Sequence, residues 1–225
     1  MGHRGARHEA PENTLLGIDL ALRAGVESIE IDVHRSADGQ LVVIHDDTVD
    51  RTTDGHGAVV ELTLAELRRL DAGQGERVPT LEEVLEAVRG KAELFVEIKA
   101  PGCEALVVEA LRAAGELERY LVKAFDHRIA LAVKELAPEL QTGCLLYGRP
   151  VDPVGLVRAA RADFLSIGLS MVDADLVAAL HAAGLKACAW NLNDPAGLPR
   201  CAALGLDWLG TDAPTQLCAA LRAAG

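Results

Sequence analysis

The chain has 225 residues, of which 50% are hydrophobic and 25% charged, and its formal net charge at pH 7 is −12. These values are typical of a soluble globular protein, and the length is enough for one domain with a large core or for two small ones. The acidic balance argues against a broad nucleic-acid-binding surface. Since no apolar run approaches the roughly 20 residues that span a bilayer, and no signal-peptide pattern begins the chain, we expect a cytoplasmic protein without stable membrane insertion.

Cysteine usage gives no sign of a disulfide framework or of a metal-binding cysteine pair. The five cysteines are odd in number, widely separated, and flanked mostly by apolar or small residues. We therefore predict reduced, buried thiols. They are Cys103, Cys144, Cys188, Cys201 and Cys218.

In chain order, a first strand is predicted around His3 and is followed by a helix over residues 13–23. The next strand, residues 29–33, alternates between apolar and acidic side chains. Because successive side chains of a strand point to opposite faces, Glu30 and Asp32 point the same way.

The next strand-like run, residues 41–46, is too close to residue 33 for a parallel crossover, which needs about a dozen residues. The link contains Asp38 and Gly39, a hairpin signal, so the run is predicted to return antiparallel. Simple register then places His45 roughly opposite Asp32, and a bulge would move it toward Glu30. Residues 47–78 are polar and irregular, with one helix expected at 64–70, and are interpreted as a small insertion.

Strands and helices alternate through the rest of the chain. Strands are predicted at residues 94–98, 121–125, 142–146, 164–167, 186–190 and 207–210. Helices are predicted at residues 80–89, 104–114, 127–136, 152–160, 173–183, 194–204 and 214–223. Eight strand–helix alternations predict an α/β fold, a (β/α)8 TIM barrel in one domain over residues 1–225. A doubly wound open sheet is the alternative, weakened because no Gly-x-Gly-x-x-Gly turn follows an early strand.

Functional residues of such barrels come from the carboxyl ends of the strands, where Glu30, Asp32 and Glu97 are predicted to lie. Three carboxylates without sulfur ligands favour one hard cation, Mg²⁺ or Ca²⁺, over Zn²⁺. The alternative is that Glu30 and Asp32 form salt bridges inside the barrel with Arg4 and Lys99. Spacing alone does not separate these two interpretations.

Three further kinds of chemistry have candidates near these carboxylates. Histidine side chains in general titrate near neutrality, so His3 and His45 are candidates for acid–base catalysis. Arg4 and Lys99 are candidates for holding a phosphate group. Trp190 and Phe125, at the ends of two strands, are candidates either for packing on a substrate or for the core.

Short motifs follow one another along essentially the whole chain: residues 3–5 (HRG), 10–14 (APENT), 30–33 (EIDV), 45–46 (HD), 50–55 (DRTTDG), 62–67 (LTLAEL), 79–85 (PTLEEVL), 97–99 (EIK), 125–126 (FD), 190–193 (WNLN) and 210–214 (GTDAP). In this order, they resemble the glycerophosphodiester phosphodiesterase family.

The resemblance implies a phosphodiesterase on a (β/α)8 barrel with a small insertion after the second strand. It places metal ligands on Glu30, Asp32 and Glu97, acid–base catalysis on His3 and His45, and phosphate contacts on Arg4 and Lys99, with Trp190 facing the substrate. The implied products are sn-glycerol 3-phosphate and an alcohol such as choline, as part of lipid and glycerol metabolism.

The chain departs from the family pattern at three places. Only Met1 and Gly2 precede His3, where relatives normally have several apolar residues, so a thin closure of the barrel is expected there. Ala124 stands where the family often has Ser, and Asn191 and Leu192 stand where it often has Thr and Val. The last two departures bear on substrate detail.

The expected reaction is metal-dependent hydrolysis of a small glycerophosphodiester, with His3 as base and His45 as acid. The nucleophile is either the adjacent glycerol hydroxyl, through a cyclic phosphate, or water. A lysophospholipase D-type enzyme on the same barrel is one alternative, with Val59, Val60, Leu62 and Leu64 lining an apolar mouth. A non-catalytic module that binds phosphate esters is another. The sequence leaves the head group and the oligomeric state open.

Overall fold

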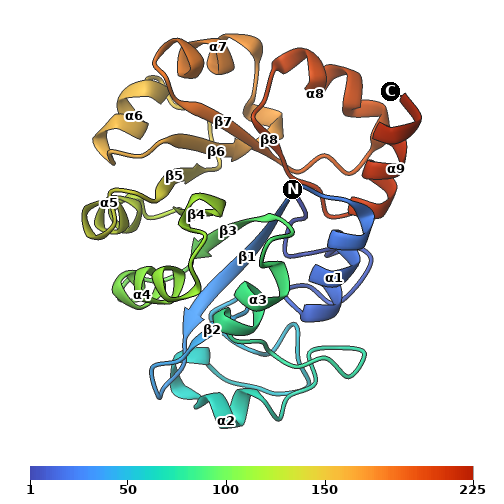
Figure 1. The fold of residues 1–225 in the computed structure, drawn as a ribbon, viewed down its shortest axis with the longest axis vertical. Coiled ribbons are helices and arrows are strands. Elements are labelled where there is room, and N and C mark those ends of the chain that lie inside the picture. The colour runs from blue at the N-terminus through green and yellow to red at the C-terminus, as the bar shows by residue number, and fades with distance from the viewer. Residues whose placement is uncertain (225) are drawn as a thin grey trace.

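The computed structural model describes residues 1–224 and shows a curled sheet surrounded by helices (Figure 1). The sheet order in this part of the chain is β2-β1-β3-β4-β5-β6-β7-β8, parallel throughout except for the antiparallel pair β1 and β2. The strands are β1 (Ser28–Arg35), β2 (Leu41–Val43), β3 (Glu93–Ile98), β4 (Tyr120–Ala124), β5 (Gln141–Leu146), β6 (Phe164–Gly168), β7 (Lys186–Trp190) and β8 (Trp208–Leu209).

The helices follow the strands closely in the predicted alternation. They are α1 (Leu15–Ala24), α2 (Leu64–Leu67), α3 (Leu81–Val88), α4 (Glu104–Ala114), α5 (His127–Leu136), α6 (Pro153–Ala159), α7 (Ala174–Ala182), α8 (Leu198–Leu204) and α9 (Pro214–Ala224). Side-chain caps start several of them, as at Thr80, where a capping box with Glu83 begins α3. The helix expected at residues 194–204 begins instead with a 3-10 turn, Pro195–Gly197, because Asp194 caps that turn.

The first predicted strand is reduced to a single pair of bridges, which close the ring between β8 and β1. Gly2 pairs in parallel with both Ile29 and Thr211. The Gly2 N–H donates to Ser28 O at 2.8 Å, and the His3 N–H donates to Thr211 O at 2.9 Å. The closure is therefore as thin as expected, but its backbone hydrogen bonds are made, and they place His3 inside the mouth of the barrel. In Figure 1 the N-terminus lies at the centre, close to β1 and β8.

The predicted hairpin is confirmed by β1 and β2. Val33 pairs with Val43, and the Ile44 N–H donates to Asp32 O at 3.0 Å. Gly39 lies in the turn at a φ of 84°, a value that favours glycine. His45 is thus one residue beyond the position opposite Asp32, close to the predicted register.

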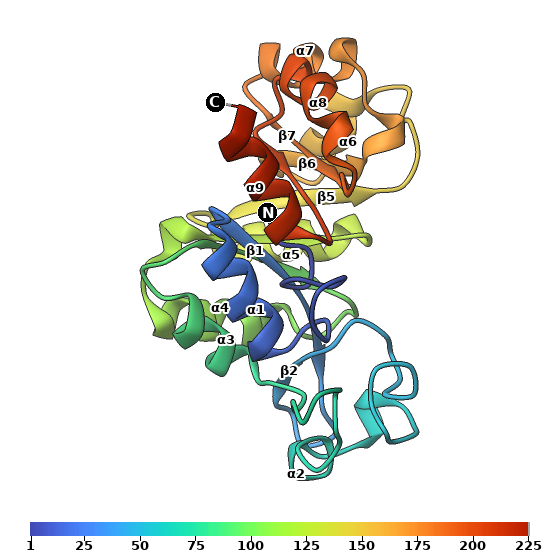
Figure 2. The same ribbon diagram turned by 90° about the vertical axis from the view of Figure 1, so that its right-hand side faces the viewer.

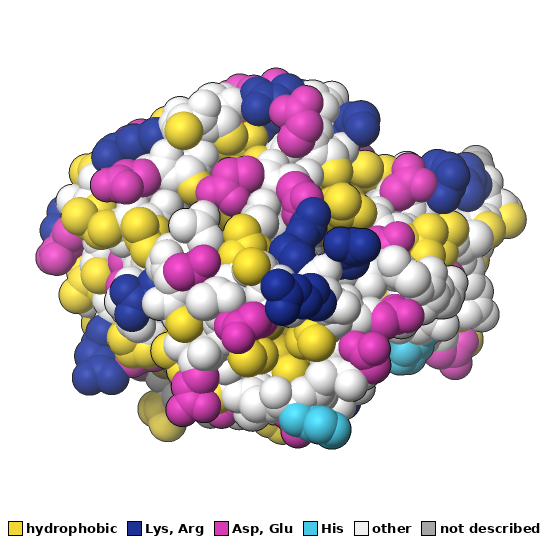
Figure 3. Space-filling model, turned by 90° about the horizontal axis from the view of Figure 1, so that it is seen from below, with side chains coloured by type: hydrophobic (Ala, Val, Ile, Leu, Met, Phe, Trp, Pro, Cys, Tyr) yellow, Lys and Arg dark blue, Asp and Glu magenta, His cyan; other side chains and the backbone are white. Residues whose placement is uncertain are grey.

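The insertion after β2 forms a small unit with its own apolar cluster. Val59 and Leu67 are buried there, while Leu62 and Leu64 pack against them. Figure 2 shows this unit projecting away from the helices and strands of the barrel. From below, acidic and basic side chains are interspersed over the surface (Figure 3). The insertion's apolar residues therefore build its core, and of the four residues expected at an apolar mouth only Val60 is well exposed.

Aromatic side chains fill the barrel interior below the mouth. Phe95, Phe164 and Trp208 contact one another with ring centroids 5.2–5.7 Å apart. A Cβ on Gly143 would lie 2.1 Å from the Phe164 ring. The Phe164 ring on β6 therefore needs a glycine at this position of the neighbouring strand β5. The packed layer forms a floor under the polar residues at the strand ends.

Within residues 1–224, no helix is both long and apolar enough to cross a membrane. Over the same residues the cysteines are free thiols, and Cys103, Cys144, Cys188 and Cys201 are buried as predicted, whereas Cys218 is only half-buried.

Candidate active site

Three buried carboxylates converge at the carboxyl ends of β1 and β3. Ligand oxygens of Glu30, Asp32 and Glu97 all lie within 4.8 Å of one another. Asp32 on β1 pairs directly with Glu97 on β3 in the parallel register. This pairing brings the two carboxylates together although the strands are far apart in sequence. The three residues are 0%, 1% and 5% exposed, so these charges are almost fully removed from water. Such an arrangement is costly unless cations compensate for it.

Part of that compensation comes from three basic side chains. Lys99 Nζ lies 2.7 Å from Glu97 Oε1 and 3.4 Å from Asp32 Oδ1, and Arg4 Nε lies 3.3 Å from Asp32 Oδ2. Lys123 Nζ lies 3.1 Å from Glu30 Oε1. The salt bridges that the sequence offered as an alternative are therefore present for Asp32, whereas the basic partner of Glu30 is Lys123.

Two of the carboxylate oxygens that face these lysines also fit a divalent cation. Among the described residues, Glu30 Oε1 and Asp32 Oδ1 are buried without a hydrogen-bond partner, although both lie near a lysine. Carboxylate oxygens are the ligands that Mg²⁺ and Ca²⁺ prefer, and buried acceptors are rarely left unpaired. The donor set thus fits one hard cation held by Glu30, Asp32 and Glu97.

Burial and neighbouring charges move the pKa values of these groups in opposite directions. Burial opposes ionisation of Glu30, but the nearby Lys123 and His3 outweigh it and lower its pKa to about 2. Burial and the charge of Asp32 raise the pKa of Glu97. Burial also opposes the charged form of Lys123, yet Glu30 and Glu97 raise its pKa to about 12. A cation would favour the ionised form of Glu97.

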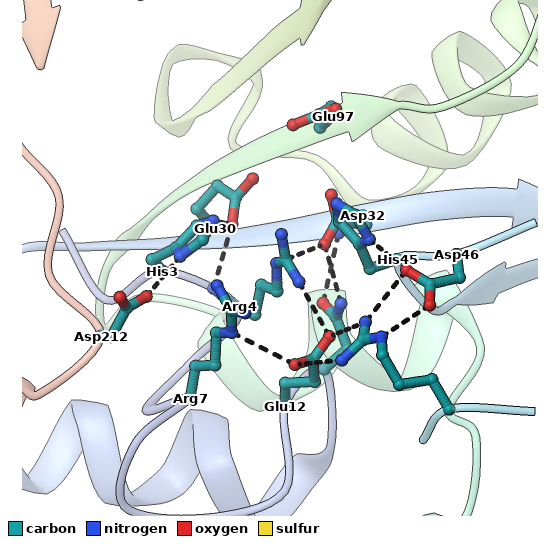
Figure 4. A network of polar contacts seen from close by, with 12 residues as sticks. His3, Arg4, Arg7, Glu12, Glu30, Asp32, His45, Asp46, Glu97 and Asp212 are labelled. Carbon is teal, nitrogen blue, oxygen red and sulfur yellow. Dashed lines mark hydrogen bonds and ion pairs between the residues drawn. The ribbon is translucent and has the colours of Figure 1, made fainter. Parts of the chain in front are cut away.

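His3 and His45 lie on either side of the carboxylates, and each is held by an aspartate (Figure 4). His3 Nδ1 is 2.6 Å from Asp212 Oδ1, and His45 Nδ1 is 2.5 Å from Asp46 Oδ1. An ionised carboxylate only accepts hydrogen bonds, so in both rings Nδ1 carries the proton. Each Nε2 is then left for other chemistry, and that of His3 lies 3.9 Å from Glu30 Oε2.

The candidate residues surround a cavity of about 260 Å³ at the barrel mouth. Its lining includes His3, Arg4, His45, Glu97, Lys123, Phe125, Leu145 and Trp190. The rings of Phe125 and Trp190 meet edge to face with centroids 6.2 Å apart. The lining therefore combines aromatic rings with charged groups, a combination suited to a small phosphate ester with an apolar side.

A family model for the glycerophosphoryl diester phosphodiesterase family matches residues 3–216 of the chain. This chain belongs to that family. It is therefore a phosphodiesterase, and the resemblance seen in the sequence motifs is confirmed.

Relatives of known name agree with the family assignment. A glycerophosphodiester phosphodiesterase of Caldanaerobacter subterraneus subsp. tengcongensis is 35% identical, with 100% of this chain and 98% of that protein covered. A crystal structure of a family member from Agrobacterium tumefaciens shares 33% identity and a TM-score of 0.89, with 97% of each chain covered. An Oleispira antarctica phosphodiesterase, solved in complex with the product sn-glycerol-3-phosphate, shares 34% identity and a TM-score of 0.91, covering 98% of this chain and 95% of that one. The TM-scores confirm the barrel fold.

Sequence reasoning on this family member missed three residues that the structure places in the site. Lys123 is the single charged residue in the apolar strand β4, and this pattern could have predicted a buried ion pair. Asp46 belongs to the His45-Asp46 motif, but only the structure shows that it holds His45. Asp212 lies in the Gly-Thr-Asp motif after β8, and only closure of the barrel brings it to His3.

Asn191, which departs from the family's Trp-Thr-Val-Asn pattern, and Asn193, which matches it, both contact Asp212. Asn191 Nδ2 donates to Asp212 Oδ1 at 3.2 Å, and Asn193 Nδ2 donates to Asp212 Oδ2 at 2.7 Å. Both asparagines therefore support the aspartate that holds His3. Burial opposes the ionised form of Asp212, but bonds from His3 and Asn193 outweigh it and lower its pKa to about 2.

Proposed function

We propose that the chain hydrolyses glycerophosphodiesters to sn-glycerol 3-phosphate and an alcohol, with one divalent cation, Mg²⁺ or Ca²⁺, and His/His acid–base catalysis. The observation that carries the proposal is the convergence of three buried carboxylates between two histidines, each held at Nδ1 by an aspartate. The substrate class is supported by the Oleispira antarctica phosphodiesterase, whose structure is a complex with the product sn-glycerol-3-phosphate.

The cation would be held by Glu30, Asp32 and Glu97. When bound, it supplies positive charge that stabilises the phosphodiester anion and its transition state. Arg4 and Lys99 would add donors to the phosphate oxygens, because both already lie beside the carboxylate cluster. Phe125 and Trp190 would pack against the apolar side of the substrate and exclude water.

His3 is proposed as the base and His45 as the acid. With Nδ1–H donated to Asp212, neutral His3 has Nε2 free to take a proton from the nucleophile. That nucleophile is the adjacent glycerol hydroxyl, through a cyclic phosphate that water then opens, or water itself. His45, held through Nδ1 by Asp46, would donate its Nε2 proton to the leaving alcohol. Burial lowers the pKa of His45 in the free protein, against the opposing charge of Asp32, and an anionic substrate would favour the protonated form.

The test is release of glycerol 3-phosphate from several glycerophosphodiesters, in EDTA and after adding back Mg²⁺, Ca²⁺ or Mn²⁺. We expect loss of activity in EDTA and recovery with a divalent cation, and isothermal titration calorimetry should show weaker cation binding for Glu97→Gln. Glu93→Gln is the matched control, because Glu93 lies on the same strand but bonds Trp208 Nε1 at the far end of the barrel. Full turnover in EDTA would refute the metal requirement.

A comparison of glycerophosphocholine with its long-chain acyl analogue tests the lysophospholipase D alternative. The insertion residues expected to line an apolar mouth are largely used in its own core. We therefore expect a preference for the deacylated substrate. Binding of either ester without metal-dependent turnover would favour the non-catalytic module.

A further inference from the structure

We propose that Arg51, which the insertion contributes, is a positioning residue that holds His45 and Arg4 in place at the same time. The inference rests on the roles proposed above for those two residues. It gives the Asp50–Gly55 motif, which the proposed mechanism leaves without a role, a function in the active site.

Arg51 joins two carboxylates from separate segments of the chain. One edge of its guanidinium meets Asp46, with Nε 2.6 Å from Oδ2 and Nη2 3.0 Å from Oδ1. The other edge meets Glu12, with Nη1 3.0 Å from Oε2 and Nη2 2.7 Å from Oε1. Because the guanidinium is planar and rigid, these paired bonds fix both the distance and the orientation between the two carboxylates.

Each of these carboxylates is in direct contact with a proposed active-site residue. Asp46 Oδ1 is 2.5 Å from His45 Nδ1, and Glu12 Oε1 accepts from Arg4 Nη1 at 2.9 Å. Arg4 in turn reaches the Asp32 carboxylate through Nε. Figure 4 shows Glu12 and Asp46 on one side of this network and the cluster of Glu30, Asp32 and Glu97 on the other. Arg51 is thus linked to the proposed acid His45 through Asp46, and to the proposed phosphate-binding Arg4 through Glu12.

Removal of Arg51 would disturb both partners in a defined way. The Glu12 side chain is only 10% exposed, so water can replace few of its lost bonds. Its charge would then be balanced only by Arg4 and Arg7, which already contact it, and Arg4 would be drawn away from the phosphate. Asp46 would lose the fork that orients it, and with it the fixed position of the His45 ring.

The loop that carries Arg51 is anchored at both ends. Thr48 forms an antiparallel bridge with Ala58, and the Val49 N–H donates to Gly57 O at 3.0 Å. Val49 itself is fully buried. Arg51 is therefore held above the barrel mouth by a shaped turn, so the insertion contributes to the site through this one side chain.

Arg68 offers a matched control within the same insertion. It makes a similar fork, to Glu83 of α3, with Nη1 2.6 Å and Nη2 2.7 Å from the two carboxylate oxygens. That pair fastens the insertion to the barrel but touches none of the proposed active-site residues. Arg68→Met therefore shows how far the loss of a purely structural arginine–carboxylate pair changes kcat, KM and the thermal midpoint.

The experiment compares kcat and KM for glycerophosphocholine in Arg51→Met, Arg51→Lys, Arg68→Met and His45→Ala, with the thermal midpoint of each. We expect Arg51→Met to lower kcat/KM by about 10- to 100-fold. The kcat should fall because the His45 ring loses its fixed position, and the KM should rise because Arg4 is drawn away from the phosphate. Arg68→Met should stay within about threefold of wild type at a similar thermal midpoint. Arg51→Lys, which keeps the charge but lacks the fork, should recover only part of the loss.

Two outcomes would overturn the inference. If Arg51→Met and Arg68→Met have the same kcat and KM, or if Arg51→Lys matches wild type, the fork has no positioning role. The His45→Ala variant separates this failure from that of the proposed function. An inactive His45→Ala beside an active Arg51→Met refutes the inference alone, whereas an active His45→Ala refutes the catalytic assignment and the inference with it.

Discussion

His3 and Asp212 lie 209 residues apart in sequence, yet His3 Nδ1 is 2.6 Å from Asp212 Oδ1. The contact forms because Gly2 bridges β1 to the segment after β8, so that closing the barrel also assembles the histidine–aspartate pair. Asp212 accepts a hydrogen bond from Nδ1–H of His3, which leaves Nε2 facing the carboxylates. One structural event, closure of the ring, therefore sets both the fold and the tautomer of the proposed base.

Replacing Asp212 by Asn is expected to lower kcat by about 10- to 100-fold while leaving KM within a few fold, because the amide no longer fixes the His3 tautomer. Steady-state assays over a range of pH give the two constants. Asp207→Asn is the control, since Asp207 also pairs with a histidine, His181, at 2.9 Å but on the outside of the barrel. Equal effects of the two variants on kcat would contradict the prediction.

The two histidines themselves should be far more sensitive to substitution than others in the chain. His3→Ala and His45→Ala are each expected to reduce kcat by about 10²- to 10⁴-fold, the usual contribution of general acid–base catalysis. His56→Ala serves as the control, because His56 is exposed on the insertion and pairs with Asp50, away from the carboxylate cluster. Circular dichroism checks folding, and near-wild-type turnover in either folded variant would exclude that histidine from the mechanism.

Strand alternation was enough to predict that Glu30 and Asp32 point the same way, and the short link with Asp38 and Gly39 was enough to predict that a hairpin carries His45 toward them. Local rules work there because the residues involved are neighbours on one strand or across one turn. The partners Lys123 and Asp212 depend on the register between distant strands and on closure of the ring, which no local pattern specifies. The Asp46–Arg51–Glu12 network likewise needs the insertion to fold back over the barrel mouth.

Lys123 is predicted to be the main stabiliser of the carboxylate cluster when no cation is bound. Removing one partner of a buried ion pair leaves an uncompensated charge, so Lys123→Met should lower the free energy of unfolding by about 3–5 kcal/mol in EDTA. A divalent cation should restore part of that loss, because it replaces the missing positive charge. Denaturant unfolding with and without Mg²⁺ measures both effects.

The exposed residue Lys91 provides the comparison, since its Nζ donates to the Ala87 carbonyl and has no other partner within residues 1–224. Lys91→Met should change stability by less than about 0.5 kcal/mol, with or without the cation. A Lys123→Met protein as stable as wild type in EDTA would show that Lys123 does not compensate for Glu30.

The stability of the protein should fall in acid partly through Glu12. Burial opposes the charge of Glu12, but Arg51 and Arg4 outweigh it and lower its pKa from 4.5 to about 2. A depressed pKa in the folded state stabilises the fold above pH 4.5, and this stabilisation, about 2–3 kcal/mol, is lost as the pH falls toward 2. Glu12→Gln should therefore be less stable than wild type at pH 7 and show a flatter decline between pH 4.5 and 2. Glu86→Gln, at an exposed pair with Arg89, should follow the wild-type curve, and a Glu12→Gln curve parallel to wild type in acid would refute the linkage.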